Sequence, residues 1–196
     1  MANVPGPEGD DPDSQARQTR ERLQVAVDAK DLMESAGLSV PEVSVGGAHC
    51  YTAVRDLPGI TEVRAGRYPL MDVRLQSHLP DLSLAAMVLA TVISHPVPEI
   101  AVLDSGHKAT GPDNGRPVLQ GVEGGFAARF SAEHGIVELE SGAEGALAPG
   151  EVARLAPWEL ASTINQYDFI RAVRNGRLEG YWPLSARGRF ASKSNS

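Results

Sequence analysis

The chain is poor in cysteine and in lysine. Cys50 is its one cysteine, which excludes an internal disulfide and a multi-cysteine zinc site. The three lysines, Lys30, Lys108 and Lys193, are far outnumbered by arginine, and the formal net charge is -7. This balance argues against a nucleic-acid-binding surface, because such a surface needs a basic stripe.

The sequence also lacks a long hydrophobic run. Its most apolar stretch, residues 82–93, is too short to span a bilayer. Residues 2–11 are acidic and contain no apolar segment, so they do not form a signal peptide. The hydrophobic content of 42% is ordinary for a globular protein, and the length of 196 residues favours one or two domains. We therefore expect a cytoplasmic protein that does not associate with membranes.

The first part of the chain predicts a tail followed by alternating helices and strands. Residues 1–15 are rich in proline, glycine and aspartate and are expected to be a disordered tail. Leu23, Val27 and Met33 recur at helical spacing and are followed by Gly37, which favours a helix ending there. Short strands are predicted at 42–45 and 60–63, with a short helix at 52–57 between them. This order is typical of the last units of a (β/α)8 barrel, so residues 16–75 are interpreted as a barrel remnant.

The rest of the chain changes to short strands separated by turns. Beyond the apolar run, strands are predicted at 100–103, 118–122, 127–130, 135–140, 152–155, 169–174 and 177–183. Asn175-Gly176, between the last two, is the clearest hairpin signal. The predicted fold class is therefore α+β, with a β-rich C-terminal domain over residues 76–190 preceded by the barrel remnant. Residues 191–196 are predicted to be a second tail.

Two glycine loops follow the two predicted strands of the barrel remnant. Gly46-Gly47 comes after the first strand, and Gly66-Arg67-Tyr68 comes after the second. Glycines at strand-to-helix turns let backbone N–H groups approach a phosphate. The alternative is that these glycines simply form turns.

The segment from Leu155 to Asp168 is interpreted as a strand that runs into a polar turn. Glu159 and Ala161 lie two residues apart, so in an extended chain they point to the same side. Two liganding side chains at that spacing could grip one metal ion, but alanine has no donor atom. The segment resembles the metal-binding segment of the D-serine dehydratase and D-threonine aldolase family, whose histidine and cysteine ligands fall on these two positions. The residues in register with the family are Pro157, Thr163, Asn165, Tyr167 and Asp168.

Further segments resemble the same family in the same order. They are residues 59–68, 89–96, 102–109, 131–135 and 176–189, so the resemblance covers roughly 20 to 190. The family carries pyridoxal phosphate on an alanine racemase-like barrel joined to a β domain. The resemblance therefore implies that residues 76–190 are a D-serine dehydratase-like β domain.

The resemblance also implies a set of site residues. The family's cofactor phosphate meets the loops that here hold Gly46, Gly47, Gly66, Arg67 and Tyr68. His134 corresponds to a histidine near the family's active site, where it could act as an acid, a base or a metal ligand. The alternative is a hydrogen-bonded structural histidine at the start of a strand.

A tightly bound metal is not expected. A carboxylate at Glu159 together with His134 makes two ligands at best, whereas catalytic zinc usually has three protein ligands. In the family the metal polarises the substrate hydroxyl, so its loss favours racemase-like proton transfer over elimination or aldol cleavage. Glu159 has an alternative interpretation as an exposed loop charge.

The cofactor lysine of the family lies on the first barrel strand, and no lysine here matches it. The resemblance therefore implies pyridoxal phosphate only with a partner chain. One hypothesis is the C-terminal portion of an amino-acid lyase or aldolase that acts with a separate barrel-bearing chain. The alternatives are a degenerate, non-catalytic binding or scaffold partner and a repurposed cofactor-independent enzyme using His134. Open edges of parallel strands pair readily, so we expect a homo-oligomer or a hetero-complex.

Overall fold

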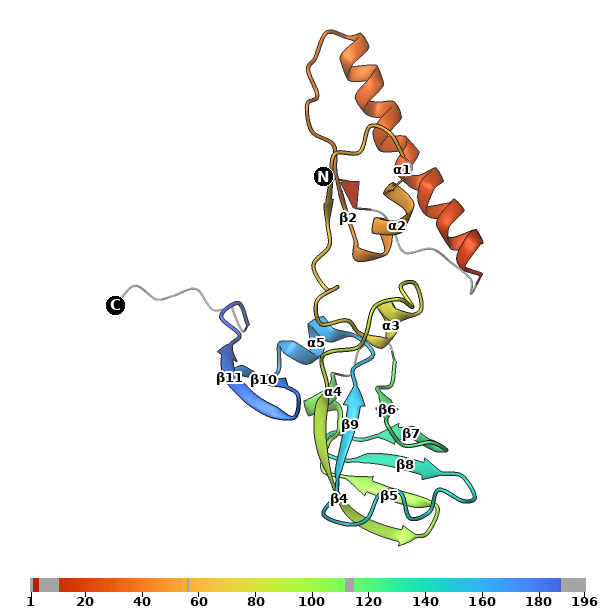
Figure 1. Cartoon of the computed structure of the whole chain (residues 1–196), viewed down its shortest axis with the longest axis vertical. Coiled ribbons are helices and arrows are strands. Elements are labelled where there is room, and N and C mark those ends of the chain that lie inside the picture. Colours follow the sequence, from red (N-terminus) through yellow and green to blue (C-terminus); the bar gives the residue numbers. More distant parts are fainter. Residues whose placement is uncertain (1, 4–10, 56, 112–114, 188–196) are drawn as a thin grey trace, which may run out of the picture. The chain divides into compact units, whose positions relative to one another are not determined.

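The structure is a computed structural model that describes residues 2–3, 11–55, 57–111 and 115–187. It divides into two compact units, Met1–Ala85 and Ala86–Ser196, which are described separately (Figure 1). The sequence placed the corresponding boundary between residues 75 and 76. The predicted tail at 191–196 lies outside the described residues.

The first unit begins its regular structure earlier than the sequence predicts. The helix α1 spans Pro12–Ser35, and the Asp11 side chain caps it by accepting a hydrogen bond from the backbone N–H of Ser14 (3.0 Å). The expected disordered tail over 1–15 is therefore wrong for residues 2–3, which form a strand, and for residues 12–15, while residues 1 and 4–10 lie outside the described residues. Gly37 has a φ of 82°, the left-handed conformation that ends many helices.

The three strands of this unit are parallel and lie in the order β1-β2-β3. They are β1 (Ala2–Asn3), β2 (Ser44–Gly46) and β3 (Glu62–Arg64), connected through α1, the 3-10 turn η1 (Ala48–Cys50) and α2 (Tyr51–Val54). The buried residues that hold the helices to the strands are Leu23, Val45, Cys50 and Ala53. This alternation of parallel strands and helices confirms the predicted barrel remnant.

A second cluster explains why the first unit extends to residue 85. The helix α3 (Val73–Gln76) is capped by Asp72, which accepts a hydrogen bond from the Leu75 backbone N–H (2.8 Å). Met71, Leu75 and Leu79 pack together with Ala48, and all four are buried. The stretch after residue 75 is thus anchored in the first unit by its own apolar residues.

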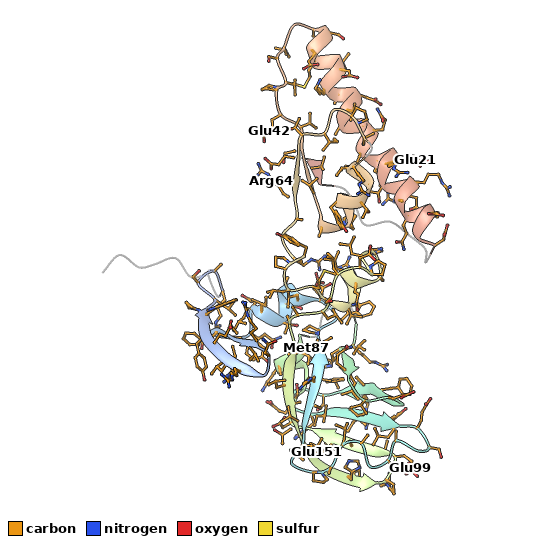
Figure 2. The ribbon with its side chains drawn as sticks, viewed as in Figure 1. Glu21, Glu42, Arg64, Met87, Glu99 and Glu151 are labelled. Carbon is orange, nitrogen blue, oxygen red and sulfur yellow. The ribbon has the colours of Figure 1, made fainter. Side chains whose placement is uncertain are left out.

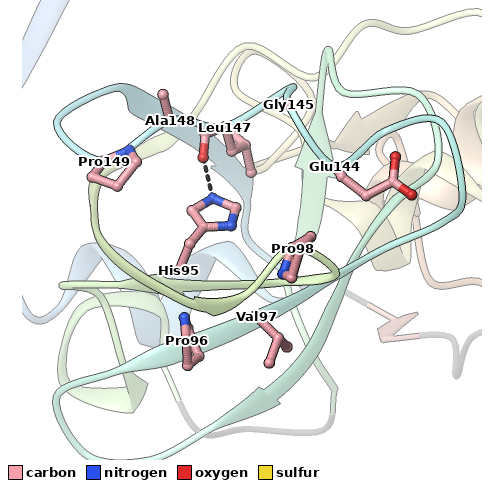
Figure 3. Close-up of a pocket in the computed structure, with 9 residues that line it drawn as sticks. All are labelled: His95, Pro96, Val97, Pro98, Glu144, Gly145, Leu147, Ala148 and Pro149. Atoms are coloured by element: carbon pink, nitrogen blue, oxygen red, sulfur yellow. Dashed lines mark hydrogen bonds between the residues drawn. The ribbon is translucent and has the colours of Figure 1, made fainter.

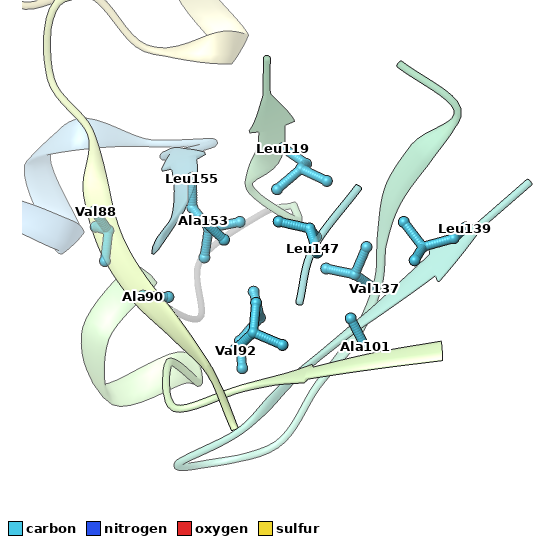
Figure 4. Packing of buried hydrophobic residues seen from close by; sticks show 11 residues of the cluster. Val88, Ala90, Val92, Ala101, Leu119, Val137, Leu139, Leu147, Ala153 and Leu155 are labelled. Atoms are coloured by element: carbon cyan, nitrogen blue, oxygen red, sulfur yellow. The ribbon is translucent and has the colours of Figure 1, made fainter. Parts of the chain in front are cut away.

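The second unit is built on a six-stranded antiparallel sheet in the order β6-β9-β4-β5-β8-β7, which is nearly closed into a barrel. Alternate residues point inward and form one core, which includes Val92, Leu103, Val137 and Leu155 (Figure 4). The predicted β-rich domain is confirmed. The strands are β4 (Val88–Val97), β5 (Ile100–Leu103), β6 (Val118–Gln120), β7 (Gly125–Phe130), β8 (Gly135–Leu139) and β9 (Val152–Ala156).

The last two strands form a separate two-stranded sheet. They are β10 (Phe169–Arg174) and β11 (Arg177–Pro183), paired antiparallel. Asn175 and Gly176 have φ values of 51° and 74°, as a two-residue hairpin turn requires, so this prediction is confirmed. No helix among the described ranges is long and apolar enough to cross a membrane.

The stability of the first unit should fall as the pH falls through the titration of His78. Burial and the nearby Arg74 lower the pKa of His78 from 6.5, and its Nδ1 lies 2.9 Å from the Gln15 Oε1. The unfolded chain therefore binds the proton more readily, so His78 destabilises the fold as the pH drops below about 6.5. Urea titrations measure how much the free energy of unfolding falls from pH 7.5 to pH 5. This fall should be smaller for His78→Gln than for the wild-type chain. An equal loss in both proteins would contradict this.

Candidate functional site

The two glycine loops lie at the same end of the parallel sheet, where its strands have their carboxyl ends. β2 and β3 run side by side with Gly46 opposite Arg64, the residue labelled in Figure 2, so both loops begin at the carboxyl ends of these strands. Barrel enzymes have their active sites at the carboxyl ends of their strands. The structure therefore brings together the two segments that the sequence singled out as a phosphate cradle.

The glycines in these loops have different roles. Gly47 has a φ of 102°, and a Cβ there would lie 2.6 Å from the His49 ring, so this position requires glycine. Around Gly66 a Cβ would meet nothing within 4 Å. The first loop is closely packed, and the second has open space beside its backbone.

Arg67 is fixed by a buried carboxylate that the sequence analysis missed. The Arg67 Nη1 donates a hydrogen bond to the Asp72 Oδ2 (2.8 Å), and the Asp72 side chain is fully buried. The Arg67 side chain is 35% exposed, so its guanidinium group remains accessible from solvent. Tyr68, next to it, is 52% exposed. The sequence signal for Asp72 was the preference of aspartate for the N-cap position, directly before the helical residues that begin at Val73.

His134 lies in the tight turn between β7 and β8. The backbones of Ser131 and His134 are hydrogen-bonded (2.8 Å), and Gly135 then begins β8. The His134 side chain is exposed, and its ring makes no hydrogen bond to the part of the chain that the structure describes. Its position before the strand agrees with the sequence, and its ring is accessible to an external ligand.

Glu159 and Ala161 do not lie on one side of an extended chain. Glu159 is extended and precedes α5 (Leu160–Ile164), whereas Ala161 is already in the first helical turn. The prediction of a polar turn here is wrong over 160–164, so the argument from two-residue spacing does not apply. Across residues 2–3, 11–55, 57–111 and 115–187, no group of three histidine, cysteine or acidic side chains is placed to hold a metal ion.

The other residues of this segment hold α5 against α4 (His107–Thr110). The Thr163 Oγ1 donates to the carbonyl of Thr110 (2.6 Å), and the Tyr167 hydroxyl donates to the carbonyl of Ala109 (2.9 Å). With its amide oriented to suit both neighbours, Gln166 accepts a hydrogen bond from the backbone N–H of Gly111 (3.0 Å) and donates one to the carbonyl of Lys108. These side chains satisfy carbonyls that a short helix leaves unpaired. The part of the motif that remains thus has a structural role that needs no metal.

Replacing Tyr167 by phenylalanine should destabilise the second unit by about 1–3 kcal/mol, because the carbonyl of Ala109 would lose its donor. Burial raises the pKa of Tyr167, so the hydroxyl remains a donor well into the alkaline range. Thermal or urea unfolding measures the loss. Tyr51→Phe, at a half-exposed tyrosine, is the control and should be within about 0.5 kcal/mol of the wild type. Equal effects of the two changes would contradict the role of the hydrogen bond.

A pocket of about 390 Å³ lies elsewhere in the second unit, between the β4–β5 turn and the loop before β9 (Figure 3). His95 lies at its centre, and its Nε2 is hydrogen-bonded to the carbonyl of Leu147. The pocket contains none of the predicted catalytic, phosphate-binding or metal-position residues. Its lining residues are His95, Pro96, Val97, Pro98, Glu144, Gly145, Leu147, Ala148 and Pro149.

Comparison with known proteins gives a consistent family. Residues 85–173 match the putative serine dehydratase domain. D-threonine aldolase from Arthrobacter sp. is 33% identical over 182 residues, which are 90% of this chain and 47% of that protein. The 3-hydroxy-D-aspartate aldolase of Paracoccus denitrificans (strain Pd 1222) is 33% identical over 83% of this chain and 43% of that protein.

Solved structures agree with the sequence matches. The D-threonine aldolase of Filomicrobium marinum superposes with a TM-score of 0.84 at 29% identity, over 91% of this chain and 50% of that one. D-threo-3-hydroxyaspartate dehydratase from Delftia sp. HT23 gives 0.75 at 27% identity, over 89% and 52%. A cysteine-to-alanine variant of the latter, described as metal-free, gives 0.72 at 26% identity over the same shares. The chain spans about half the length of these relatives; it belongs to the D-serine dehydratase and D-threonine aldolase-like family and corresponds to the C-terminal part of its members.

Proposed function

We propose that this chain is the C-terminal portion of a pyridoxal-phosphate-dependent amino-acid lyase or aldolase-like protein, acting with a separate chain that carries the cofactor lysine. The observation that carries the proposal is the pair of loops at the carboxyl ends of the parallel strands β2 and β3. Gly46 ends β2, Gly66 follows the adjacent strand β3, and the buried Asp72 fixes Arg67 next to Gly66. Backbone N–H groups and a guanidinium are the groups that bind phosphate.

The loop at Gly66 and Arg67 fits the phosphate of the cofactor. The lysines that the structure describes are not placed to bind the cofactor covalently. The open space at Gly66 leaves room beside the loop, and the guanidinium group of Arg67, whose side chain is 35% exposed and held by Asp72, offers further N–H donors. When bound, pyridoxal phosphate supplies an electron sink for reaction at the substrate Cα. Lys30 is paired with Glu34, Lys108 is paired with Glu133, and Lys193 lies outside the described residues. A lysine from another chain is therefore part of the proposal.

The residues at the former metal positions favour proton transfer over carbon–oxygen or carbon–carbon cleavage. The relatives are named as aldolases and a dehydratase of 3-hydroxy amino acids. Glu159 offers one oxygen ligand and Ala161 offers none, so this chain's side chains do not supply the hydroxyl activation that cleavage needs. Racemase-like proton transfer on a small amino acid requires no such activation. The exposed His134 is the candidate acid or base of the alternative, a repurposed enzyme that works without the cofactor.

The partner is expected at the open edges of the parallel sheet. Within the described residues, the outer edges of β1 and β3 pair with no further strand. Open edges of parallel strands associate readily, so we propose a homo-oligomer or a complex with a barrel-bearing chain. A monodisperse monomer in light scattering at micromolar concentration would count strongly against this.

Equilibrium dialysis with pyridoxal phosphate tests the proposed cradle. We expect the wild-type chain to bind the cofactor and Arg67→Ala to bind it at least tenfold more weakly, because a charged phosphate contact is lost. Arg17→Ala, at an exposed arginine on α1, is the control and should bind as the wild type does. Binding that is unchanged in Arg67→Ala would remove the basis for the cradle. A folded wild-type chain without affinity would instead favour the non-catalytic scaffold.

A further inference from the structure

The hairpin β10–β11 presents an apolar face with no partner among the described residues. The cross-strand pairs Phe169–Pro183, Arg171–Tyr181 and Val173–Leu178 lie on one face, because directly opposed residues share a face. The large apolar side chains on it, Phe169, Val173, Leu178 and Tyr181, are each between 51% and 61% exposed. On the opposite face Ala172 is buried and Trp182 is 59% exposed, so the hairpin offers large apolar side chains to solvent on both faces. A contiguous exposed patch of this kind marks an interaction site.

The hairpin segment carries more arginines than carboxylates in a chain that is otherwise acidic, and Arg171 is the arginine on the face described above. Residues 168–187 contain four arginines and two carboxylates, whereas the chain as a whole carries -7. Arg174 and Arg187 pair with Glu179 and Asp168. Arg171 lies over the Tyr181 ring, 5.8 Å from its centroid, and remains available to a carboxylate from outside. Arginine beside an exposed aromatic ring is typical of the residues that dominate protein interfaces.

The pocket around His95 has the complementary properties. Its walls are mainly apolar, formed by prolines, Val97 and Leu147, and its volume of about 390 Å³ accommodates an aromatic side chain. Glu144 lines it, and the segments 95–101 and 138–153 contain no lysine or arginine. These segments carry five carboxylates, two of which, Glu99 and Glu151, are labelled at this end of the sheet in Figure 2. The pocket is thus an apolar hollow in an acidic surface.

We propose that the β10–β11 hairpin of one copy of the chain docks into the His95 pocket of a second copy. Tyr181 enters the apolar hollow and Arg171 faces Glu144. An apolar side chain then meets an apolar wall, and a positive charge meets a negative one. The two contributing surfaces differ, which makes the interface heterologous and lets each copy give one hairpin and receive another. This contact lies in the second unit and is separate from the open strand edges of the first.

A charge-reversal experiment tests this docking in the full chain. We expect Arg171→Glu alone and Glu144→Arg alone to weaken self-association at least tenfold in sedimentation equilibrium. An equimolar mixture of the two variants should associate like the wild type, because every hairpin then finds a pocket of opposite charge. Tyr181→Ala should also weaken association while the far-ultraviolet circular dichroism stays unchanged.

Matched variants separate this contact from other association. Arg129→Glu and Glu123→Arg make the same charge changes at exposed positions outside both surfaces and should leave association unchanged. Failure of the mixture to recover would overturn the proposal, as would a wild-type strength of association in Glu144→Arg. Weakened association in Arg171→Glu together with unchanged association in Glu144→Arg would show that the hairpin docks on something other than this pocket. Association through the strand edges of the first unit would persist in all of these variants.

Discussion

A chain carrying both Glu159→His and Ala161→Cys should retain about one zinc ion after dialysis against a weak chelator, whereas the wild-type chain should retain none. The two changes supply an imidazole and a thiolate at the positions where the family has its ligands, and His134 supplies a third candidate ligand. The hydrogen bonds of Thr163 and Tyr167 keep the segment in place, so its backbone is preserved for the new ligands. Elemental analysis of the purified protein measures the metal content.

The single variants are the controls for this prediction. Each of them offers at most one new ligand and should bind at least tenfold more weakly than the double variant. A folded double variant that stays without zinc would show that the alignment of Pro157 to Asp168 with the family segment is wrong. Zinc retained by the wild-type chain would contradict the proposal that the metal has been lost.

Replacing Gly106 by alanine should destabilise the second unit by about 3 kcal/mol or more. A Cβ at this position would lie 2.5 Å from the carbonyl carbon of Ala132, which is backbone and cannot rotate away. The first turn of α4 lies against the β7–β8 turn, and His107 and Lys108 donate backbone hydrogen bonds to it (2.8 and 3.1 Å). The new methyl group would separate these segments and break both bonds.

Gly145→Ala is the matched control in the same unit. A Cβ there meets nothing within 4 Å, and its φ is not in the left-handed region, so the change should lie within about 0.5 kcal/mol of the wild type. Urea unfolding followed by circular dichroism measures both variants. A loss for Gly106→Ala no greater than that for Gly145→Ala would contradict the close approach of α4 to the β7–β8 turn.

Strands with strong local signals could be predicted from the sequence. The strands predicted at 118–122, 127–130, 135–140 and 152–155 correspond to β6 to β9, and Asn175-Gly176 forms the expected hairpin turn. These signals are local, since turn residues need particular φ values and buried strands need apolar runs or alternation. The sequence also indicated that the two glycine loops follow neighbouring parallel strands, which is sufficient to place them at one edge.

The short helices could not be predicted in the same way. α3, α4 and α5 are four or five residues long, and an isolated helix of this length is unstable without tertiary contacts. α5 depends on the bonds from Thr163 and Tyr167 to carbonyls more than fifty residues away in the sequence. The pairing of Arg67 with Asp72 was missed because burial of the carboxylate is a property of the packed first unit.

Borohydride reduction of the chain with pyridoxal phosphate, followed by mass spectrometry, tests the central claim most directly. The account predicts that the chain alone binds the cofactor reversibly and that reduction fixes none of it covalently to Lys30, Lys108 or Lys193. With a barrel-bearing partner chain present, the reduced cofactor should be found on a lysine of that partner. Stoichiometric covalent labelling of one lysine of this chain, in the absence of any partner, would contradict the account.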